Sequence, residues 1–237
     1  MILFFDIGGT KFRYYLLEDD FLIDSYTTLC NDKDIFLLLK NCTMFLNTFY
    51  KINEIYVSIA GIVDNYKITG MNNLKLKNNK LIDELFEIPV YYINDGDAFI
   101  LGEMEFNNMK SDLNVLGLYF GTGVGCGLYL NKNLVKNSEA YRYMEKYMKE
   151  NVLNENNINE VCKFLGNEIS NLVELLNLDY IIINGYVNKF NDFPTKLINN
   201  LNFNKYYKTK LIFSKCDIPI AYGLFEFRKY ILTNGLV

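Results

Sequence analysis

Residues 2–11 read ILFFDIGGTK, and residues 115–127 read VLGLYFGTGVGCG. In each stretch an apolar run typical of a buried strand leads into a glycine–threonine turn. A second strand-like run follows each turn, at residues 12–17 and 126–130. The same plan therefore occurs at the start and near the middle of the chain, and it predicts two similar halves.

The length and composition suit a protein with two lobes. The chain has 237 residues, of which 50% are apolar, so it can bury a full core. Its net charge of −4 offers no cationic face for nucleic acid or an anionic membrane. No stretch approaches the roughly 20 apolar residues of a membrane-spanning helix, and Met1 leads directly into a strand pattern. We therefore expect a soluble, cytoplasmic protein that binds neither nucleic acid nor membrane.

The sequence contains no histidine, which excludes His-based catalytic triads and His metal sites. Acid–base chemistry would therefore fall to carboxylates, Lys, Tyr or Cys. The cysteines lie far apart, without a CxC or CxxC pair, so we expect reduced, mostly buried thiols and no zinc site. They are Cys30, Cys42, Cys126, Cys162 and Cys216.

The first half of the chain predicts an α/β lobe with a mixed sheet, in which three strands joined by tight turns precede alternating helices and strands. The expected strands cover 2–6, 12–17, 21–27, 54–60 and 90–93, and the expected helices cover 34–50, 80–87 and 98–106. Ligand sites gather at the carboxyl ends of strands in such sheets. Asp6 and Asp95 both stand at such ends.

The second half repeats this order. We expect strands at 114–120, 126–130, 133–136, 180–183 and 209–213, and helices at 139–150, 158–176 and 221–232. The repeat and a polar stretch at 108–113 predict a boundary between an N-terminal lobe, 1–110, and a C-terminal lobe, 111–237.

The two glycine–threonine turns are candidates for phosphate binding. Glycine exposes backbone N–H groups that can surround phosphate oxygens, and two such turns facing each other would hold a polyphosphate. The candidate residues are Gly8, Gly9, Thr10 and Lys11 in the first turn and Gly121, Thr122 and Gly123 in the second. Asp6 beside phosphates makes sense mainly if Mg²⁺ and its waters intervene. The alternative is two ordinary β-hairpins, whose turns also favour Gly and Thr.

Asp95 is the candidate general base. Phosphoryl transfer needs positioning and charge neutralisation, and one carboxylate suffices to accept the proton of an attacking hydroxyl. Asp95 follows a buried strand and begins a helix, whose N-terminal dipole favours its ionised form. Asn94 beside it could hydrogen-bond a sugar hydroxyl. The alternative is that Asp95 or Asp97 serves only as the N-cap of the helix.

These motifs, in their order and spacing, resemble those of the ROK family of sugar kinases, which belongs to the sugar kinase, Hsp70 and actin superfamily. The resemblance covers about residues 1–138 and resumes at 163–190. The motifs are DIGGTK at 6–11, VSIAGIVDN at 57–65, Asn73-Leu74, INDGDAFILGE at 93–103 and FGTGVGCGLYLNKNLV at 120–135.

The resemblance implies two ribonuclease-H-like lobes of the actin-like ATPase fold, with mixed sheets and a central cleft that holds ATP, Mg²⁺ and a sugar. It implies that the helix at 221–232 packs back on the first lobe. By motif position, Asp6 would hold Mg²⁺ through water, Gly185 would contact adenosine, and Asp95 would be the base. The residues that the resemblance assigns to the sugar are Gly61, Asn73, Asn94, Asp95 and Glu139.

One segment departs from the family. Between 138 and 163 the chain is shorter and lacks the His and Cys residues of the family's zinc motif. Glu139 or Glu145 could replace the first missing glutamate, and either could equally be a solvated helix residue. The acceptor therefore stays open between a hexose, an amino sugar and a smaller alcohol.

A non-catalytic ATP- or sugar-binding regulator is the alternative from another class. The family's DNA-binding regulators carry a helix-turn-helix before the kinase-like part, whereas this sequence starts at the first strand, so we expect no DNA binding. The aromatic content of 16% could supply a homodimer interface.

Overall fold

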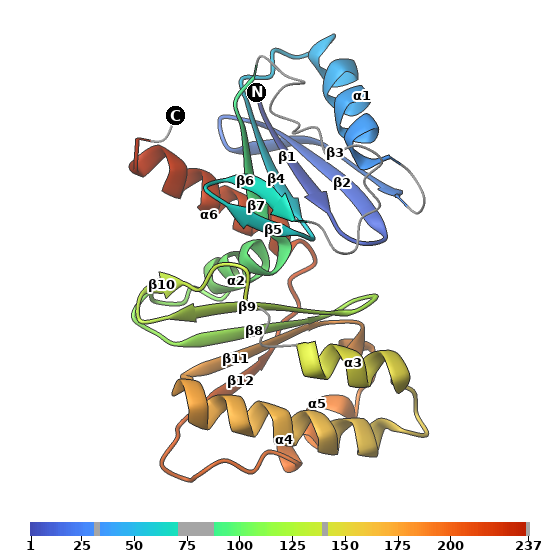
Figure 1. Cartoon of the computed structure of the whole chain (residues 1–237), viewed down its shortest axis with the longest axis vertical. Helices are drawn as coiled ribbons and strands as arrows, with labels where there is room; N and C mark the ends of the chain where they lie inside the picture. Colours follow the sequence, from blue (N-terminus) through green and yellow to red (C-terminus); the bar gives the residue numbers. More distant parts are fainter. Residues whose placement is uncertain (31–33, 71–87, 139–141, 236–237) are drawn as a thin grey trace.

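Each glycine–threonine turn joins the first two strands of a five-stranded sheet (Figure 1). The computed structural model describes residues 1–30, 34–70, 88–138 and 142–235. The predicted helix at 80–87 lies outside these residues.

The first sheet has the order β3-β2-β1-β4-β7. Its first three strands pair antiparallel, and β4 and β7 then continue the sheet parallel to β1. The strands are β1 (Ile2–Ile7), β2 (Lys11–Glu18), β3 (Phe21–Leu29), β4 (Glu54–Ile59) and β7 (Val90–Asn94). This is the mixed sheet that the sequence predicts.

The second sheet repeats the topology of the first, with the order β10-β9-β8-β11-β12. Here too an antiparallel trio is extended by two parallel strands. The strands are β8 (Val115–Phe120), β9 (Val124–Leu130), β10 (Asn133–Leu134), β11 (Tyr180–Gly185) and β12 (Lys210–Phe213). The prediction of an α/β fold built from one plan used twice is confirmed, whereas the boundary at 110 stays a prediction.

Helices cover both faces of each sheet, because the alternate side chains of these strands are apolar on both sides. On the first sheet, α1 (Ile35–Asn47) covers one face through Ile35 and Leu39. The other face packs against α6 (Pro219–Thr233), which buries Leu224, Phe227 and Ile231 there. The C-terminal helix therefore packs on the first sheet.

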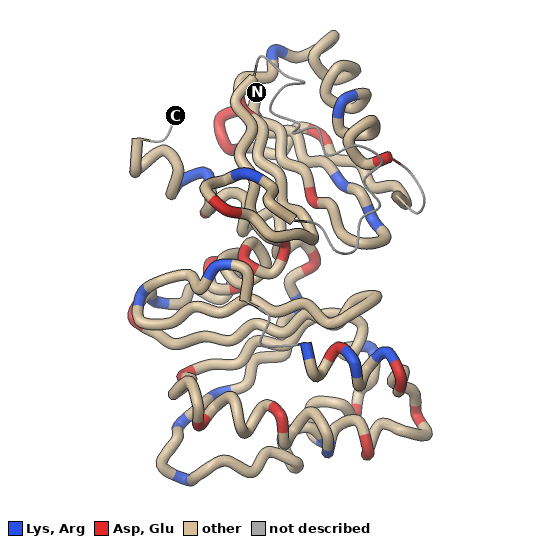
Figure 2. The backbone as a smooth tube through the Cα atoms, viewed as in Figure 1, with Lys and Arg blue, Asp and Glu red and all other residues tan. Residues whose placement is uncertain are grey.

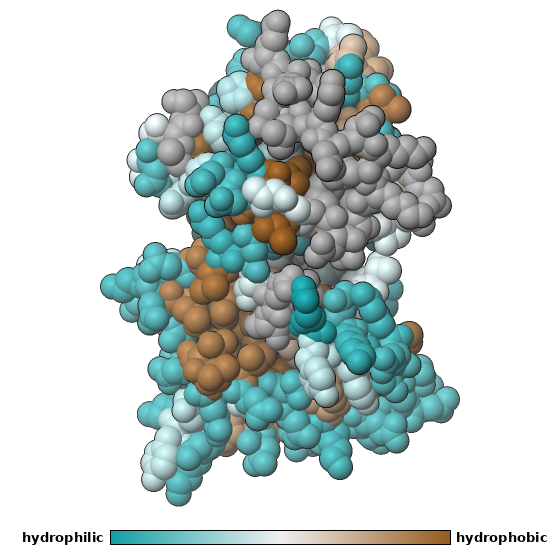
Figure 3. Space-filling model, in the orientation of Figure 1, coloured by the Kyte–Doolittle hydropathy of each residue, from teal (hydrophilic) through white to brown (hydrophobic). Residues whose placement is uncertain are grey.

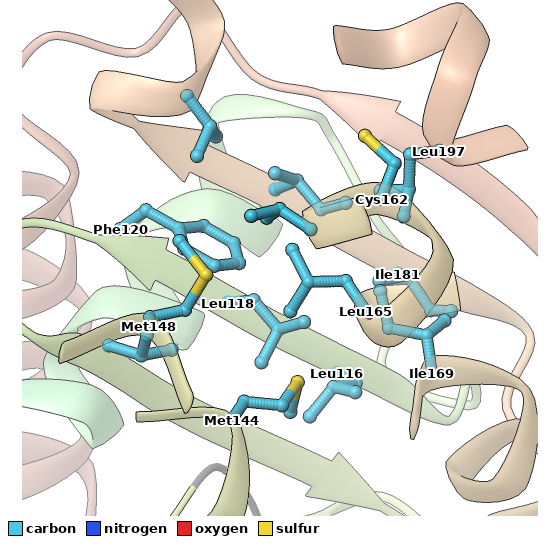
Figure 4. Packing of buried hydrophobic residues seen from close by; sticks show 14 of the residues in the cluster. Leu116, Leu118, Phe120, Met144, Met148, Cys162, Leu165, Ile169, Ile181 and Leu197 are labelled. Atoms are coloured by element: carbon cyan, nitrogen blue, oxygen red, sulfur yellow. The ribbon is translucent and has the colours of Figure 1, made fainter. Parts of the chain in front are cut away.

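The second sheet is covered in the same way. Three helices lie on one face: α3 (Arg142–Glu150), α4 (Ile158–Leu176) and α5 (Phe193–Asn199). Figure 4 shows Met144 and Met148 of α3 directed towards Leu118 and Phe120 of β8. The other face receives α2 (Asp95–Phe106) through Ile100.

The helices α2 and α6 therefore form one layer between the two sheets, as Figure 1 shows. Their backbones touch where they cross, because a Cβ atom on Gly223 would overlap the carbonyl oxygen of Ala98. Glycine at the crossing lets the two helices come close enough to share one layer between the sheets.

Two elements beside this layer were not predicted. A small hairpin of β5 (Ile62–Asp64) and β6 (Lys67–Gly70) follows β4, and a short 3-10 helix, η2 (Tyr186–Lys189), follows β11.

The face drawn in Figure 3 is mostly hydrophilic over α3 and α4, with a hydrophobic area over β9 and β10. No helix within the described ranges is both long and apolar enough to span a bilayer.

Candidate active site

The two glycine–threonine turns meet between the sheets. Thr10 Oγ1 and Thr122 Oγ1 share a hydrogen bond of 2.8 Å, although the two residues lie 112 positions apart in sequence. The structure thus brings the predicted turns face to face. Their binding of phosphate stays a prediction.

Each turn uses one of its own N–H groups internally. Gly8 N–H donates to the Lys11 carbonyl at 3.0 Å, and Gly121 N–H donates to the Gly123 carbonyl at 2.8 Å. The N–H groups of Gly9, Thr10 and Thr122 are then the candidate phosphate donors. A Cβ on Gly9 would meet nothing within 4 Å, so the first turn borders open space.

The second turn is lined by side chains. A Cβ atom on Gly121 would lie 2.9 Å from the ring of Tyr119, and one on Gly123 would lie 2.8 Å from Glu145 Oε1. Glu145 also forms an ion pair with Lys149 at 2.8 Å. The structure therefore places Glu145 beside the second turn, rather than as the solvated helix residue that the sequence also allowed.

Asp6 lies at the carboxyl end of β1, where its buried side chain faces Arg13 of β2. The two residues are direct partners in the antiparallel register, and Arg13 Nη1 lies 3.1 Å from Asp6 Oδ2. Burial raises the pKa of Asp6 to about 6, and the nearby Asp95 raises it too, whereas Arg13 and Lys11 oppose the rise. Asp6 and Asp95 are thus close enough to interact electrostatically.

Asp95 follows β7 and is the first residue of α2. The N-cap of the helix is Asn94, whose Oδ1 accepts hydrogen bonds from Gly96 N–H at 2.9 Å and Asp97 N–H at 3.2 Å. The alternative that Asp95 or Asp97 is the cap is therefore wrong. Burial raises the pKa of Asp95, and the hydrogen bond from Gly96 N–H to its Oδ1 partly opposes this.

The start of α2 rests on the second sheet, which places Asp95 between the sheets. A Cβ atom on Gly96 would overlap the carbonyl oxygen of Cys126 in β9, so only glycine allows this approach. Figure 2 shows acidic residues of α2 in the region between the two sheets. Asp95 therefore directly follows the last strand of the first sheet, and its neighbour Gly96 contacts the second sheet.

On the predicted sugar side, Asn94 and Gly61 do come together. Asn94 Nδ2 donates to the Gly61 carbonyl at 2.8 Å, so both ends of this amide have protein partners. Asn73 and Glu139 lie outside the described residues. The sugar contacts stay predictions.

A polar chain that the sequence did not predict ties this side of the site across the two halves. Both carboxylate oxygens of Asp97 accept the Asn137 N–H, at 3.1 and 3.0 Å. The Asn137 side chain in turn binds Val63 N–H and the Val63 carbonyl, each at 2.9 Å. Asp97 is buried, which raises its pKa to about 7. We call Asp97, Asn137 and Val63 the clasp.

Gly185 ends β11 beside the second turn, paired with Phe120 of β8 in the parallel register. Its φ of 108° lies in the left-handed region that favours glycine. The preceding Asn184 donates through Nδ2 to Glu103 Oε1 at 2.6 Å and to the Cys216 carbonyl at 2.9 Å. The glycine predicted to contact adenosine therefore lies at the carboxyl end of β11, where the second glycine–threonine turn begins in β8.

The site suits a cation that needs few protein ligands. Mg²⁺ keeps several waters and takes one or two carboxylates together with substrate phosphates. Asp95 raises the pKa of Asp6, and a cation near both carboxyl groups would oppose this repulsion. Among the described residues no group of three or more His, Cys, Asp or Glu is arranged to hold a metal.

Sequence analysis did not single out Arg13, Tyr119 or the clasp. One signal was available for Arg13. Asp6 and Arg13 are equally far from the centre of the first turn, and a tight hairpin makes such residues cross-strand partners. The clasp had no such signal because its members are distant in sequence.

Two sheets of one topology, joined through facing turns, define an α/β protein of the actin-like ATPase fold with ribonuclease-H-like halves. The chain belongs to the ROK family, which residues 3–140 match. It is 27% identical to the xylose repressor of Staphylococcus xylosus over 207 residues, which are 76% of this chain and 54% of the repressor. In the xylose repressors that match, the aligned part covers 25% to 54% of the length, so the chain spans about half or less of these relatives.

Two solved structures share the fold over nearly their whole length. An inorganic polyphosphate/ATP-glucomannokinase from an Arthrobacter species has a TM-score of 0.72 at 18% identity, with 97% of this chain and 98% of that chain covered. A ROK family glucokinase from Streptomyces griseus, solved with glucose and AMPPNP, has a TM-score of 0.71 at 13% identity, with 96% and 99% covered. At these identities the likeness establishes the fold.

Proposed function

We propose that this protein is a kinase that transfers the γ-phosphoryl group of ATP to the hydroxyl of a sugar, in the cytoplasm. The observation that supports this most is the contact between Thr10 and Thr122, which unites two phosphate-binding motifs at one point. The carboxyl groups of Asp6 and Asp95 lie within electrostatic reach of each other near this point.

In the proposed reaction Asp95 is the general base. Its carboxylate accepts the proton of the acceptor hydroxyl as the oxygen forms a bond to the γ-phosphorus, and the bond from that phosphorus to the β,γ-bridging oxygen breaks to release ADP. The raised pKa of Asp95 suits this role because a stronger base takes the proton more readily at neutral pH.

Other residues bind and orient. The N–H groups of Gly9, Thr10 and Thr122 and the charge of Lys11 would hold phosphate oxygens, and Gly185 would leave room for adenosine. Asp6 would hold Mg²⁺ through water, and the bound ion would neutralise phosphate charge. Asn94 caps α2, the helix that begins at Asp95.

An ADP-release assay tests this proposal. The protein is incubated with ATP and Mg²⁺ against hexoses, N-acetylated amino sugars, xylose and small polyols. We expect turnover on one class of acceptor, loss of turnover with EDTA, and a fall in kcat of at least about a hundredfold in Asp95→Asn. Asp192→Asn, an exposed carboxylate on another element, is the matched control.

Full activity in Asp95→Asn would reject Asp95 as the base. No turnover with any acceptor, in a protein that binds ATP, would favour a second function.

That second function is a regulator that binds sugar or nucleotide without turnover. It is supported by the similarity to xylose repressors, one of which aligns with 76% of this chain. It predicts that a sugar of the panel binds with a measurable Kd in calorimetry while ADP release stays at background. Either function could act as a homodimer, which analytical ultracentrifugation would detect.

A further inference from the structure

Arg13 is a charged group of the site that the proposed mechanism does not use. Its guanidinium is mostly buried, with 23% of the side chain exposed, and it binds Asp6 Oδ2 at 3.1 Å. The bond to Asp6 uses Nη1, and a guanidinium has five N–H donors in a fixed plane, so donors are left over for a ligand.

Tyr119 connects Arg13 with the second turn. The ring of Tyr119 lies against Gly121, and the charges of Arg13 and Asp6 both act on the Tyr119 hydroxyl. Arg13 comes from the first sheet and Tyr119 from the second. The guanidinium therefore lies beside the first turn and within electrostatic reach of Tyr119, whose ring lies against the second turn.

The other mostly buried arginine, Arg228, differs from Arg13 in its location and in its number of carboxylate partners. Arg228 of α6 binds Asp20 Oδ1 at 3.0 Å and Glu54 Oε2 at 3.1 Å, at the end of the first sheet opposite the first turn, where β1 and β4 begin. Its single positive charge thus faces two carboxylates. Among the described residues Arg13 pairs with one carboxylate, Asp6. Lys11 and Asp95 also act electrostatically on Asp6.

We propose that Arg13 is a phosphate-binding residue of this site, whose spare N–H groups donate to the terminal phosphate of a bound nucleoside triphosphate. This inference rests on the proposed function for the location of the nucleotide, and it adds the residue that distinguishes a triphosphate from a diphosphate. Planar guanidinium groups bind phosphate oxygens through paired hydrogen bonds, which a lysine at the same place does not reproduce.

The competing explanation is that Arg13 only neutralises the buried Asp6. The two roles differ in what they do to nucleotide selectivity. A neutralising arginine would affect ATP and ADP alike, through the shape of the first turn. A residue that binds the terminal phosphate affects only the nucleotide that has one.

The test measures dissociation constants by calorimetry for the non-hydrolysable triphosphate AMPPNP and for ADP, each with Mg²⁺ and without any acceptor. We expect Arg13→Gln to weaken AMPPNP binding by about tenfold or more, because a lost charged hydrogen bond has this effect, while ADP binding changes by less than about threefold. Arg13→Lys should recover only part of the loss. Arg228→Gln is the matched control and should leave the ratio of the two constants unchanged.

The double variant Asp6→Asn/Arg13→Gln keeps the pair neutral and guards against loss of folding. If it restores the wild-type ratio of the AMPPNP and ADP constants, Arg13 only neutralises Asp6 and the inference is overturned. Equal weakening of both nucleotides by Arg13→Gln overturns it as well. Because this test measures nucleotide binding without an acceptor, its result does not depend on whether the kinase assay detects turnover.

Discussion

Three buried carboxyl groups, Asp6, Asp97 and Glu103, and the half-buried Asp95 hold their protons more tightly than exposed carboxyl groups do. Burial raises the pKa of Asp6 to about 6 and that of Asp97 to about 7, and it raises the pKa of Asp95 and Glu103 as well. A carboxyl whose pKa is higher in the folded than in the unfolded state stabilises the fold below its unfolded pKa. That stabilisation is lost as the pH rises through the folded pKa.

The pH dependence of Asp97 can be isolated with Asp97→Asn. From pH 5 to pH 8 wild-type Asp97 loses its proton, with Asp95 opposing and Lys136 favouring the charge. The free energy of unfolding of the wild type should therefore fall relative to that of the variant by about 2 kcal/mol over this range. Urea unfolding at the two pH values measures this. Parallel pH profiles would show that Asp97 ionises as it does in the unfolded chain.

Part of the site was predictable at this scale and part was not. The turns, Asp6 and Asp95 follow from local patterns, since glycine, threonine and aspartate mark strand ends. The identity of the helix cap did not follow, because Asn94, Asp95 and Asp97 all suit an N-cap. In the structure Asn94 is the cap, so the Asp95 carboxylate is not used for capping and is available to the site.

The elements were predicted best where periodicity was strong. The pattern for 158–176 gave α4 with both ends correct, and Asn177 ends that helix with a φ of 49°. The elements that were not predicted are short: α5 has seven residues, and β5 and β6 have three and four. Elements this short contain too few residues for a period to be recognised, and tertiary contacts decide them.

The crossing of α2 and α6 yields a prediction on stability. Gly223→Ala places a methyl group against the Ala98 carbonyl and must push the helices apart. We expect a loss of about 1–3 kcal/mol or more in the free energy of unfolding, measured with urea at constant pH. Gly125→Ala, where a Cβ would meet its nearest neighbours at 3.8 Å and 3.9 Å, is the control. A change below about 0.5 kcal/mol in Gly223→Ala would mean that the helices do not cross this closely.

At the scale of the whole molecule, the clasp joins the two halves beside the candidate sugar side. Lys136 adds a second contact, with its Nζ 5.4 Å from the centre of the Tyr66 ring in the β5–β6 hairpin. The hairpin that follows β4 is therefore anchored to the loop that follows β10.

Removing the clasp should free the hairpin without unfolding the protein. In Asn137→Ala the Val63 N–H and carbonyl lose their partner, and we expect amide hydrogen exchange in 62–70 to rise by about tenfold or more. Mass spectrometry of peptides resolves this. Asn151→Ala is the control, since its Nδ2 binds only the Tyr147 carbonyl one turn earlier in the chain. Unchanged exchange in 62–70 would show that other contacts hold the hairpin.

The packing of α6 on the first sheet has a consequence for synthesis on the ribosome. Ile2, Phe4 and Tyr56 emerge early, yet the side chains that cover them, Leu224, Phe227 and Ile231, are among the last to be made. A nascent chain thus exposes one apolar face of its first sheet until translation has passed Thr233. The first half to be synthesised is therefore the last to be completed, and its uncovered apolar face is open to chaperone binding until α6 has formed.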